Sequence, residues 1–270
     1  MTSPARWIPP VRLRGAWQMA IDEWLLDQAL RPGQANQGLV VRLYQWERPT
    51  LSIGFHQRRL PDHWFQLVDS GTVEMVRRPS GGRAVLHEGD LTYCLVWPHP
   101  PAHRQQTYRL ACGWLQQTFR TIGLPLVFGH QSAGQQISSC FATHTAADLI
   151  HASCGAKRIG SAQLWRQGCL LQHGSILISP SHRLWRSVFG DDPPRMPALN
   201  ISIDNLTEQL FLAAQRHLPL DGGRSSSLGV SPLTTAELTA IGERMNRYKV
   251  PLGDQGVDLM SPARSIDSTT

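Results

Sequence analysis

The sequence predicts an α+β protein in which a central mixed, mostly antiparallel sheet is flanked by helices. Residues 147–178 have the pattern of three strands joined by tight turns, which is typical of antiparallel pairing. Before residue 147, strand-like and helical segments follow one another without a regular order, and helical patterns resume at residue 182. This order of elements favours the α+β class over a regularly alternating parallel fold.

Length and composition set the limits of this prediction. With 270 residues, 41% of them hydrophobic, the chain can bury a sizeable core and form one main domain. The beginning of the chain shows no apolar run of signal-peptide length, and no later segment reaches the roughly 18 apolar residues that a membrane span needs. We therefore expect a cytoplasmic protein that does not enter a membrane.

The five cysteines include no CxxC pair, and five is an odd number. This pattern fits neither a disulfide framework nor a zinc ribbon, so we expect reduced thiols and no metal site. The formal charge of +6 and the pI near 9.4 favour an acidic partner through electrostatic steering. Because the basic residues are scattered and no nucleic-acid-binding signature is present, we do not expect that partner to be nucleic acid.

The first half of the chain contains a clear helix and several strands. From 16 to 30, the residues Trp17, Ile21, Trp24 and Leu25 share one helical face, and the sequence Arg-Pro-Gly at 31–33 ends the helix. Further elements are expected as strands at 39–46, 50–54, 73–76 and 91–97, a short helix from about residue 61, and a helix at 104–122 that ends before Gly123.

The second half of the chain is expected to complete the main domain and to add a linker and a C-terminal helix. Helical spacing predicts helices at 182–189 and 204–217, with Asp204 capping the first turn of the latter. We predict a main domain at 1–220, a flexible linker at 221–231, a C-terminal helix at 232–251 and a disordered tail at 252–270. A capping-box pattern formed by Thr234 and Glu237 marks the start of the last helix.

One motif, RRPSGGRAVLHEGDLTY at 77–93, combines a basic pair, a glycine turn and a histidine between two strands. Backbone N–H groups in a glycine turn can approach a ligand closely, and two arginines beside the turn would add cationic donors. The alternative is a hairpin loop with solvated arginines. The residues that we expect to bind substrate here are Arg77, Arg78, Ser80, Gly81, Gly82 and His87.

A second motif lies at 155–177, where a lysine precedes a run of small residues and a histidine follows in the next strand. Small side chains leave room for a ligand, and Lys157 could stabilise charge on a carbonyl or phosphate oxygen. The alternatives are a solvated turn lysine and, for His173, a hydrogen-bonded histidine in the sheet. The expected substrate-binding residues here are Gly160, Ser161, Ala162, Gln163, His173 and Gly174.

Together these segments resemble the lipoate and biotin protein ligase superfamily, in its branch of lipoate-protein ligases and octanoyltransferases. The resemblance covers roughly residues 10 to 215 and rests on four segments in order: GAWQMAIDEWLL at 15–26, LYQWERPTLSIGFHQ at 43–57, RRPSGGRAVLH at 77–87, and KRIGSAQ with LLQHGSIL between 157 and 177. It implies the catalytic-domain fold of that superfamily, with a sheet that holds an acyl chain in a tunnel. It also implies a catalytic role for Lys157.

The two branches differ in how they obtain the acyl group. The similar octanoyltransferases carry a Cys-Phe pair before the lysine motif, and Cys140–Phe141 stands at that place. The resemblance therefore implies that Cys140 is a nucleophile that accepts the acyl group as a thioester, without ATP. The chain departs from the family pattern just before the lysine, at Ala147, Cys154 and Ala156, and Cys154 and Cys169 are rival thiols.

We therefore expect an octanoyltransferase that moves an octanoyl group from acyl carrier protein to a lysine of a lipoyl domain or of a glycine-cleavage H-type protein. It would need no cofactor. One alternative is an ATP-dependent lipoate-protein ligase, which would use ATP and Mg²⁺ and in which Cys140 would be a bystander. Another alternative is an acyl-binding or biotinoid-binding protein without catalysis, which would have no need for Lys157.

Overall fold

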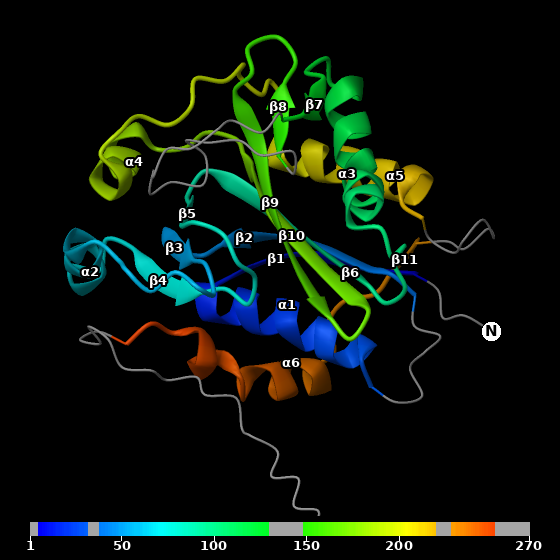
Figure 1. The fold of residues 1–270 in the computed structure, drawn as a ribbon, viewed down its shortest axis with the longest axis horizontal. Coiled ribbons are helices and arrows are strands. Elements are labelled where there is room, and N and C mark those ends of the chain that lie inside the picture. Colours follow the sequence, from blue (N-terminus) through cyan, green and yellow to red (C-terminus); the bar gives the residue numbers. More distant parts are fainter. Residues whose placement is uncertain (1–4, 32–37, 130–147, 220–227, 252–270) are drawn as a thin grey trace, which may run out of the picture.

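The computed structural model describes residues 5–31, 38–129, 148–219 and 228–251, and it confirms the predicted α+β class (Figure 1). An eight-stranded sheet crosses the middle of the molecule. From edge to edge its strands are β11 (Leu228–Val230), β1 (Ala5–Leu13), β2 (Val40–Trp46), β6 (Asp90–Trp97), β10 (Cys169–Leu177), β9 (Lys157–Arg166), β8 (Leu149–His151) and β7 (Leu126–Phe128). A smaller sheet contains β4 (Glu74–Arg77), β3 (Thr50–Ile53) and β5 (Val85–His87), in that order.

The large sheet is mixed but mostly antiparallel, as predicted. β1 pairs in parallel with β11 and with β2, whereas the remaining pairs of this sheet are antiparallel. β9 and β10 form a hairpin whose turn uses Gln167 at φ 47° and Gly168 at φ 82°. Because β10 also pairs with β6, Gly174 lies between Ser161 on one side and Tyr93 on the other.

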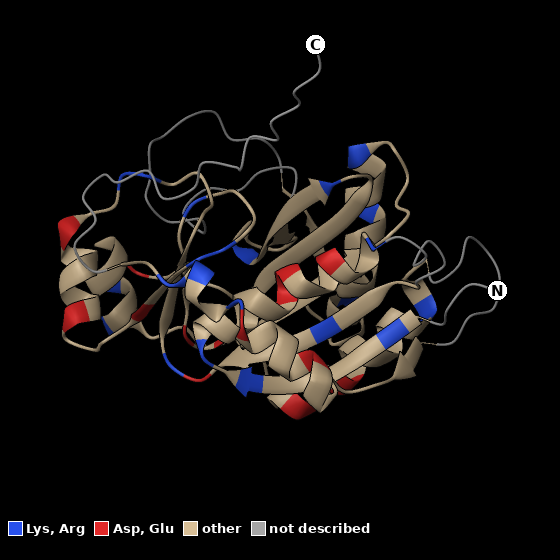
Figure 2. Cartoon of the chain, turned by 90° about the horizontal axis from the view of Figure 1, so that it is seen from below, with Lys and Arg blue, Asp and Glu red and all other residues tan. Residues whose placement is uncertain are grey.

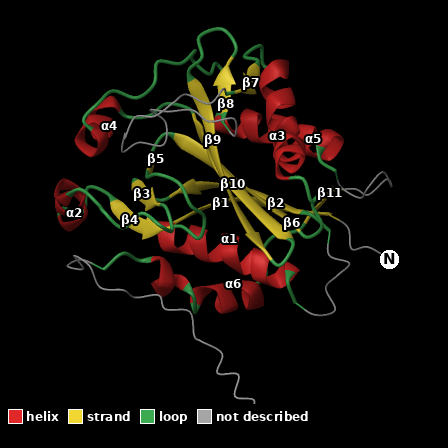
Figure 3. Cartoon of the chain, in the orientation of Figure 1, coloured by secondary structure: helices red, strands yellow, loops and turns green. Residues whose placement is uncertain are grey.

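Helices cover both faces of the large sheet (Figure 3). α1 (Gly15–Ala29) lies on one face, and α3 (Arg104–Thr121) and α5 (Ile203–His217) lie on the other. The strand period of two divides β6 between them: Tyr93 and Leu95 join the core under α3 and α5, and Cys94 and Val96 join the core under α1.

A third apolar cluster holds the small sheet. α2 (Asp62–Asp69) and α4 (His182–Phe189) pack beside this sheet, where Trp64 and Trp185 meet Leu51 and Leu86. The indole N–H of the fully buried Trp64 donates to the carbonyl of Val188 at 2.7 Å, so its polar atom is satisfied. The same cluster includes Leu177 of β10, so it also joins the small sheet to the large one.

Four strands were absent from the prediction: β1, β5, β7 and β11. β1 contains Pro9 and Pro10, which cannot donate to a neighbouring strand, and its register with β2 shifts between Ile8 and Val11 to accommodate them. β5 and β7 are three residues long, too short for a periodic signal.

Two predictions near the C-terminal part are corrected. Residues 228–230, placed in the predicted linker, instead form β11 and pair with β1. Asp204 was predicted to cap α5, but Ser202 is the N-cap residue, and its hydroxyl accepts from the Asn205 amide. Ser202 has the extended backbone that a cap requires, whereas Asp204 is already in the first helical turn.

The C-terminal helix begins as predicted, with a capping box of Thr234 and Glu237, and gives α6 (Thr235–Gly242). It is shorter than predicted, and a separate 3₁₀ helix, η1 (Met245–Tyr248), follows it. Both lie along α1, where Arg244 bonds to Asp27. Within the described ranges, no helix is both long and apolar enough to cross a membrane.

Candidate active site

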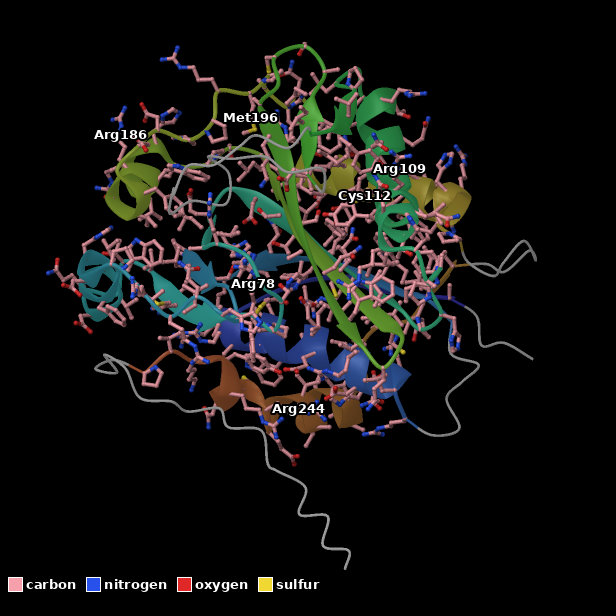
Figure 4. The ribbon with its side chains drawn as sticks, in the orientation of Figure 1. Arg78, Arg109, Cys112, Arg186, Met196 and Arg244 are labelled. Carbon is pink, nitrogen blue, oxygen red and sulfur yellow. The ribbon has the colours of Figure 1, made fainter. Side chains whose placement is uncertain are left out.

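The glycine loop after β4 is organised from inside by Arg78. Its guanidinium donates to the carbonyl of Ser52 at 2.7 Å, to that of Gly81 at 2.8 Å and to that of Arg83 at 2.7 Å. Arg78 is only 5% exposed and lies at the centre of the molecule (Figure 4). Gly82 has a φ of 101°, which favours glycine, and a Cβ there would lie 2.8 Å from Arg78 Nη2. The predicted turn is therefore a packed loop rather than a solvated hairpin.

Arg77 stabilises the neighbouring loop in the same way. Its Nη1 atom donates to the carbonyls of Gly54 at 2.9 Å and Gln57 at 2.8 Å. The two loops touch at Gly54, where a Cβ would lie only 1.9 Å from the carbonyl oxygen of Gly82. Arg77 and Arg78 thus both donate hydrogen bonds to backbone carbonyls of these loops. The position of each loop depends on that of the other.

A buried chain of three polar side chains runs from β6 to β3. His87 Nδ1 lies 2.8 Å from Asp90 Oδ2, and its Nε2 lies 2.8 Å from Ser52 Oγ. A carboxylate only accepts, so Nδ1 carries the proton and Nε2 accepts the hydrogen bond of the Ser52 hydroxyl. The ring stacks on Trp46 with 3.9 Å between centroids. Burial lowers the pKa of His87, although Asp90 opposes this shift, so the imidazole is neutral at pH 7.

A second chain with the same order of groups runs from α1 to the glycine loop. His173 Nδ1 lies 2.9 Å from Asp22 Oδ2, and its Nε2 lies 2.5 Å from Ser80 Oγ. Tyr44 also donates to Asp22 Oδ2 at 2.9 Å. Burial disfavours ionisation of Asp22, but Arg42, His173 and Tyr44 outweigh it, and the pKa of Asp22 is lowered. This chain ties the loop to the large sheet and to α1.

Small residues make up one wall between these chains. On β9 and β10, Ala162 pairs with His173, Ser161 with Gly174, and Gly160 with Ser175. A Cβ on Gly174 would lie 2.6 Å from Tyr93 and 2.7 Å from the carbonyl of Gly160, so only glycine fits at this position. The small-residue segment therefore allows the strands and the aromatic ring to pack closely.

The loop, both chains and this wall surround a small pocket, whose empty space, part of it open to solvent, is about 460 Å³. Most of the surface that it presents is apolar, and its polar side chains are hydrogen-bonded within the protein, several of them to residues behind the lining such as Asp22, Asp90 and Tyr93. Its lining residues are Met19, Tyr44, Trp46, Ser52, Arg78, Gly82, Val85, His87, Thr92, Gly160, Ser161, Ala162, His173, Gly174 and Ser175.

Lys157 does not line this pocket. It lies at the start of β9, is 3% exposed, and its Nζ atom lies 3.0 Å from Asp148 Oδ1. The same strand reaches the pocket three residues later, at Gly160. The alternative of a solvated turn lysine is therefore wrong, because the ammonium is buried and paired with a carboxylate.

Cys140 lies outside the described residues, so its position is not part of this geometry. Burial raises the pKa of Cys94 and Cys169, and it raises the pKa of Cys112 to about 12. These three thiols pack in the interior and are poor nucleophiles. Of the described cysteines, Cys154 is the exposed one, in the turn before β9.

Comparison with known proteins identifies the family. The lipoyl protein ligase A/B catalytic domain matches residues 14–207. The chain belongs to this family. Over 247 residues it is 30% identical to the octanoyltransferase LipM of Lysinibacillus sphaericus, which covers 82% of this chain and 87% of that protein. It is 38% identical over 182 residues to the octanoyltransferase LipM of Carboxydothermus hydrogenoformans, with 64% of each chain covered, which is less than two thirds of that relative's length.

Solved structures support the same fold. A bipartite lipoate protein ligase from Thermoplasma acidophilum, solved in a study that included its E2 lipoyl domain, matches with a TM-score of 0.66 at 16% identity. The match covers 92% of this chain and 93% of that chain. A lipoate-protein ligase A bound with ATP matches with a TM-score of 0.69 at 18% identity, covering 92% and 95%. The predicted ligase-type fold is thereby confirmed.

The site brings together most of the residues that the two motifs suggested. The pocket is lined by Arg78, Gly82, His87, Gly160, Ser161, Ala162, His173 and Gly174. Ser80 does not line the pocket but is hydrogen-bonded to His173, which does. Arg77, Gly81 and Gln163 line a neighbouring groove.

Sequence reasoning missed three polar residues of the two chains, Asp22, Ser52 and Asp90. A signal for Asp22 existed, since it falls on the buried side of the first helix between Met19 and Leu26. A carboxylate on an apolar helix face needs a buried partner. Neither Ser52 nor Asp90 stands out from its strand in this way.

Proposed function

We propose that this protein is an octanoyltransferase that moves an octanoyl group from acyl carrier protein to a lysine of a lipoyl-accepting protein. The pocket is the observation that carries this proposal: it is mostly apolar, has a wall of small residues, and its polar side chains are already hydrogen-bonded within the protein. Such a surface suits an alkyl chain, which offers no hydrogen bonds. The similarity to two octanoyltransferases supports the same activity.

In the first step, the Cys140 thiolate attacks the carbonyl carbon of the carrier thioester. The new C–S bond forms as the bond to the carrier sulfur breaks, and the carrier leaves as a thiol after taking up a proton. Lys157 would stabilise the negative charge that develops on the carbonyl oxygen. Asp148 holds the Lys157 ammonium at a fixed place, which reduces the reorganisation that this role requires.

In the second step, the acceptor lysine attacks the Cys140 thioester as a neutral amine. An amide bond forms, the cysteine leaves as a thiolate, and the nitrogen loses a proton. Ser52 and His87 both line the pocket, and the neutral imidazole accepts from the serine hydroxyl. They would relay that proton towards Asp90, which would stabilise the imidazolium.

The test is the intact mass of the full-length protein after incubation with octanoyl-loaded acyl carrier protein, without ATP. We expect a covalent octanoyl adduct that is absent from Cys140→Ala and that transfers its acyl group to a lipoyl domain. Cys154→Ala is the matched control, because Cys154 is the exposed cysteine of the described chain, and its adduct should persist.

Two outcomes would contradict the proposal. An adduct that survives in Cys140→Ala would place the acyl group elsewhere. Modification of the lipoyl domain from free octanoate, only with ATP and magnesium, would instead show a lipoate-protein ligase.

A further inference from the structure

A groove beside the pocket carries an unusual concentration of arginines. Its empty space, part of it open to solvent, is about 1,280 Å³, and five of its fourteen lining residues are arginines, whereas one, Glu23, is acidic. We call it the arginine groove. Arg78 lines both the groove and the pocket, and the glycine loop contributes Gly81 to the groove and Gly82 to the pocket. The two sites therefore meet at this loop.

The arginines reach the groove from separate elements of the fold. Arg77 ends β4, Arg104 begins α3, Arg166 ends β9 and Arg247 lies in η1. Arg104 and Arg247 are exposed, and Arg77 is half-buried. In the view from below, Lys and Arg lie on several separate elements and form no single block (Figure 2). The concentration thus arises from tertiary structure.

The single carboxylate of the groove is already engaged. Glu23 accepts from Arg166 at 2.5 Å and from the hydroxyl of Tyr248. Arg166 also bonds to Asp27 at 2.7 Å. After this pairing, the groove keeps an excess of positive charge that suits an anionic partner.

An excess of positive charge is also found around Arg77. Burial lowers its pKa, and the neighbouring charge of Arg58 adds to this effect. Two cations that repel each other gain when an anion lies between or beside them. Guanidinium groups also match phosphate and carboxylate oxygens with two parallel hydrogen bonds.

β9 connects the two sites. Its residues Gln163–Arg166 line the groove, and Gly160–Ala162 line the pocket. At about 3.3 Å per strand residue, four residues separate Arg166 from Ala162 by about 13 Å. A ligand that follows this strand could hold its anionic part among the arginines while its acyl chain enters the pocket. Phe55 and Trp165 add apolar surface along the way.

We propose that the arginine groove docks the acyl donor itself, an acidic carrier protein whose thioester is attached to a phosphate-linked arm. This inference rests on the proposed octanoyl transfer. A magnesium nucleotide is the rival occupant, but Mg²⁺ prefers carboxylate ligands, and the groove's one carboxylate is held by Arg166 and Tyr248. In the described part of the chain, no group of His, Cys, Asp or Glu forms a metal site.

The experiment replaces the two exposed arginines and compares two donors. Arg104→Glu, Arg247→Glu and the double variant are assayed with octanoyl-loaded acyl carrier protein and with octanoyl-N-acetylcysteamine, a small thioester that lacks phosphate and protein. We expect the ratio of kcat/KM for the carrier to that for the small thioester to fall at least about tenfold, mainly through KM. Arg120→Glu is the control, because Arg120 is exposed on α3 but lies outside the groove.

An unchanged ratio in the double variant would overturn the proposal. So would weaker binding of ATP in the same variant with no change in the ratio, since the groove would then serve a nucleotide. Direct titration of acyl carrier protein against the wild-type and double-variant proteins separates this inference from the proposed function. If no acyl transfer occurs at all, weaker carrier binding by the variant would still support docking, and equal binding would reject it.

Discussion

The pocket and the arginine groove share one loop but differ in the surface that they present: the pocket is mostly apolar, and the groove is positively charged. In the pocket, His87 and His173 are paired with carboxylates in buried chains and Arg78 donates to backbone carbonyls, so that most of the surface is apolar. In the groove, Arg166 is paired with carboxylates, but Arg104 and Arg247 are exposed and Arg77 donates to backbone carbonyls, so an excess of positive charge remains. If the proposed function holds, the shape of the pocket would select the acyl group, and the charge of the groove would select the molecule that delivers it.

The largest expected effect concerns Lys157. Lys157→Met should lower kcat/KM by about 10²–10³, because the developing oxyanion loses its cation. It should also destabilise the fold by about 3–5 kcal/mol, since the buried carboxylate of Asp148 loses the ammonium that it pairs with. Acyl transfer and urea unfolding measure the two effects.

The double variant Asp148→Asn/Lys157→Met separates these roles. It removes both charges and should recover much of the free energy of unfolding while the rate stays low. Recovery of the rate together with stability would show that Lys157 is only structural.

The next largest effect tests whether shape selects the acyl chain. Ala162→Leu places a larger side chain in the wall of the pocket. We expect kcat/KM for octanoyl donors to fall about 10- to 100-fold, while a butyryl donor loses much less. Ala152→Leu is the control, because Ala152 is exposed in the turn before β9. Equal losses for both chain lengths would contradict a role of this wall in holding the chain.

The pocket should be sensitive to pH through His87. Its folded pKa is lowered by burial, so between that value and the unfolded value of about 6.5 the unfolded chain binds more protons. The free energy of unfolding should therefore decrease as the pH falls below about 6.5, and the loss should be complete below the folded pKa. Denaturant titrations of wild type and His87→Gln measure this component.

His87→Gln should flatten that pH dependence of the free energy of unfolding. A pH profile of stability that is identical in the His87 variant would show that His87 does not titrate in this range.

The smallest expected effect concerns salt. Arginines stay charged throughout this pH range, so carrier docking should respond to ionic strength instead. Between 0.05 and 0.5 M NaCl we expect KM for the carrier donor to rise several-fold, roughly as screening shortens the range of charge. Kinetics with the small thioester provide the reference. A parallel rise in KM for both donors would indicate a general effect of salt on the enzyme.

Local pattern was sufficient for most of the fold. Helical spacing located α1 and α3, and turn residues located the β9–β10 hairpin, because apolar periodicity and turn chemistry act over a few residues. Local pattern did not predict β1, because two prolines interrupt its strand pattern. It also did not predict β11, whose partner strand lies more than 200 residues earlier. The pairing of such distant segments leaves little trace in either segment alone.

The sequence by itself determined the glycine loop, the small-residue wall and the histidines that became part of the pocket. Only the tertiary structure decided their partners: Asp22 and His173 are 151 residues apart, and Ser80 and His173 are 93 apart. It also gathered the arginines of the groove from four elements. The physical reason is that burial forces each polar group to find whichever partner the strand order brings near. That order depends on the packing of the whole chain.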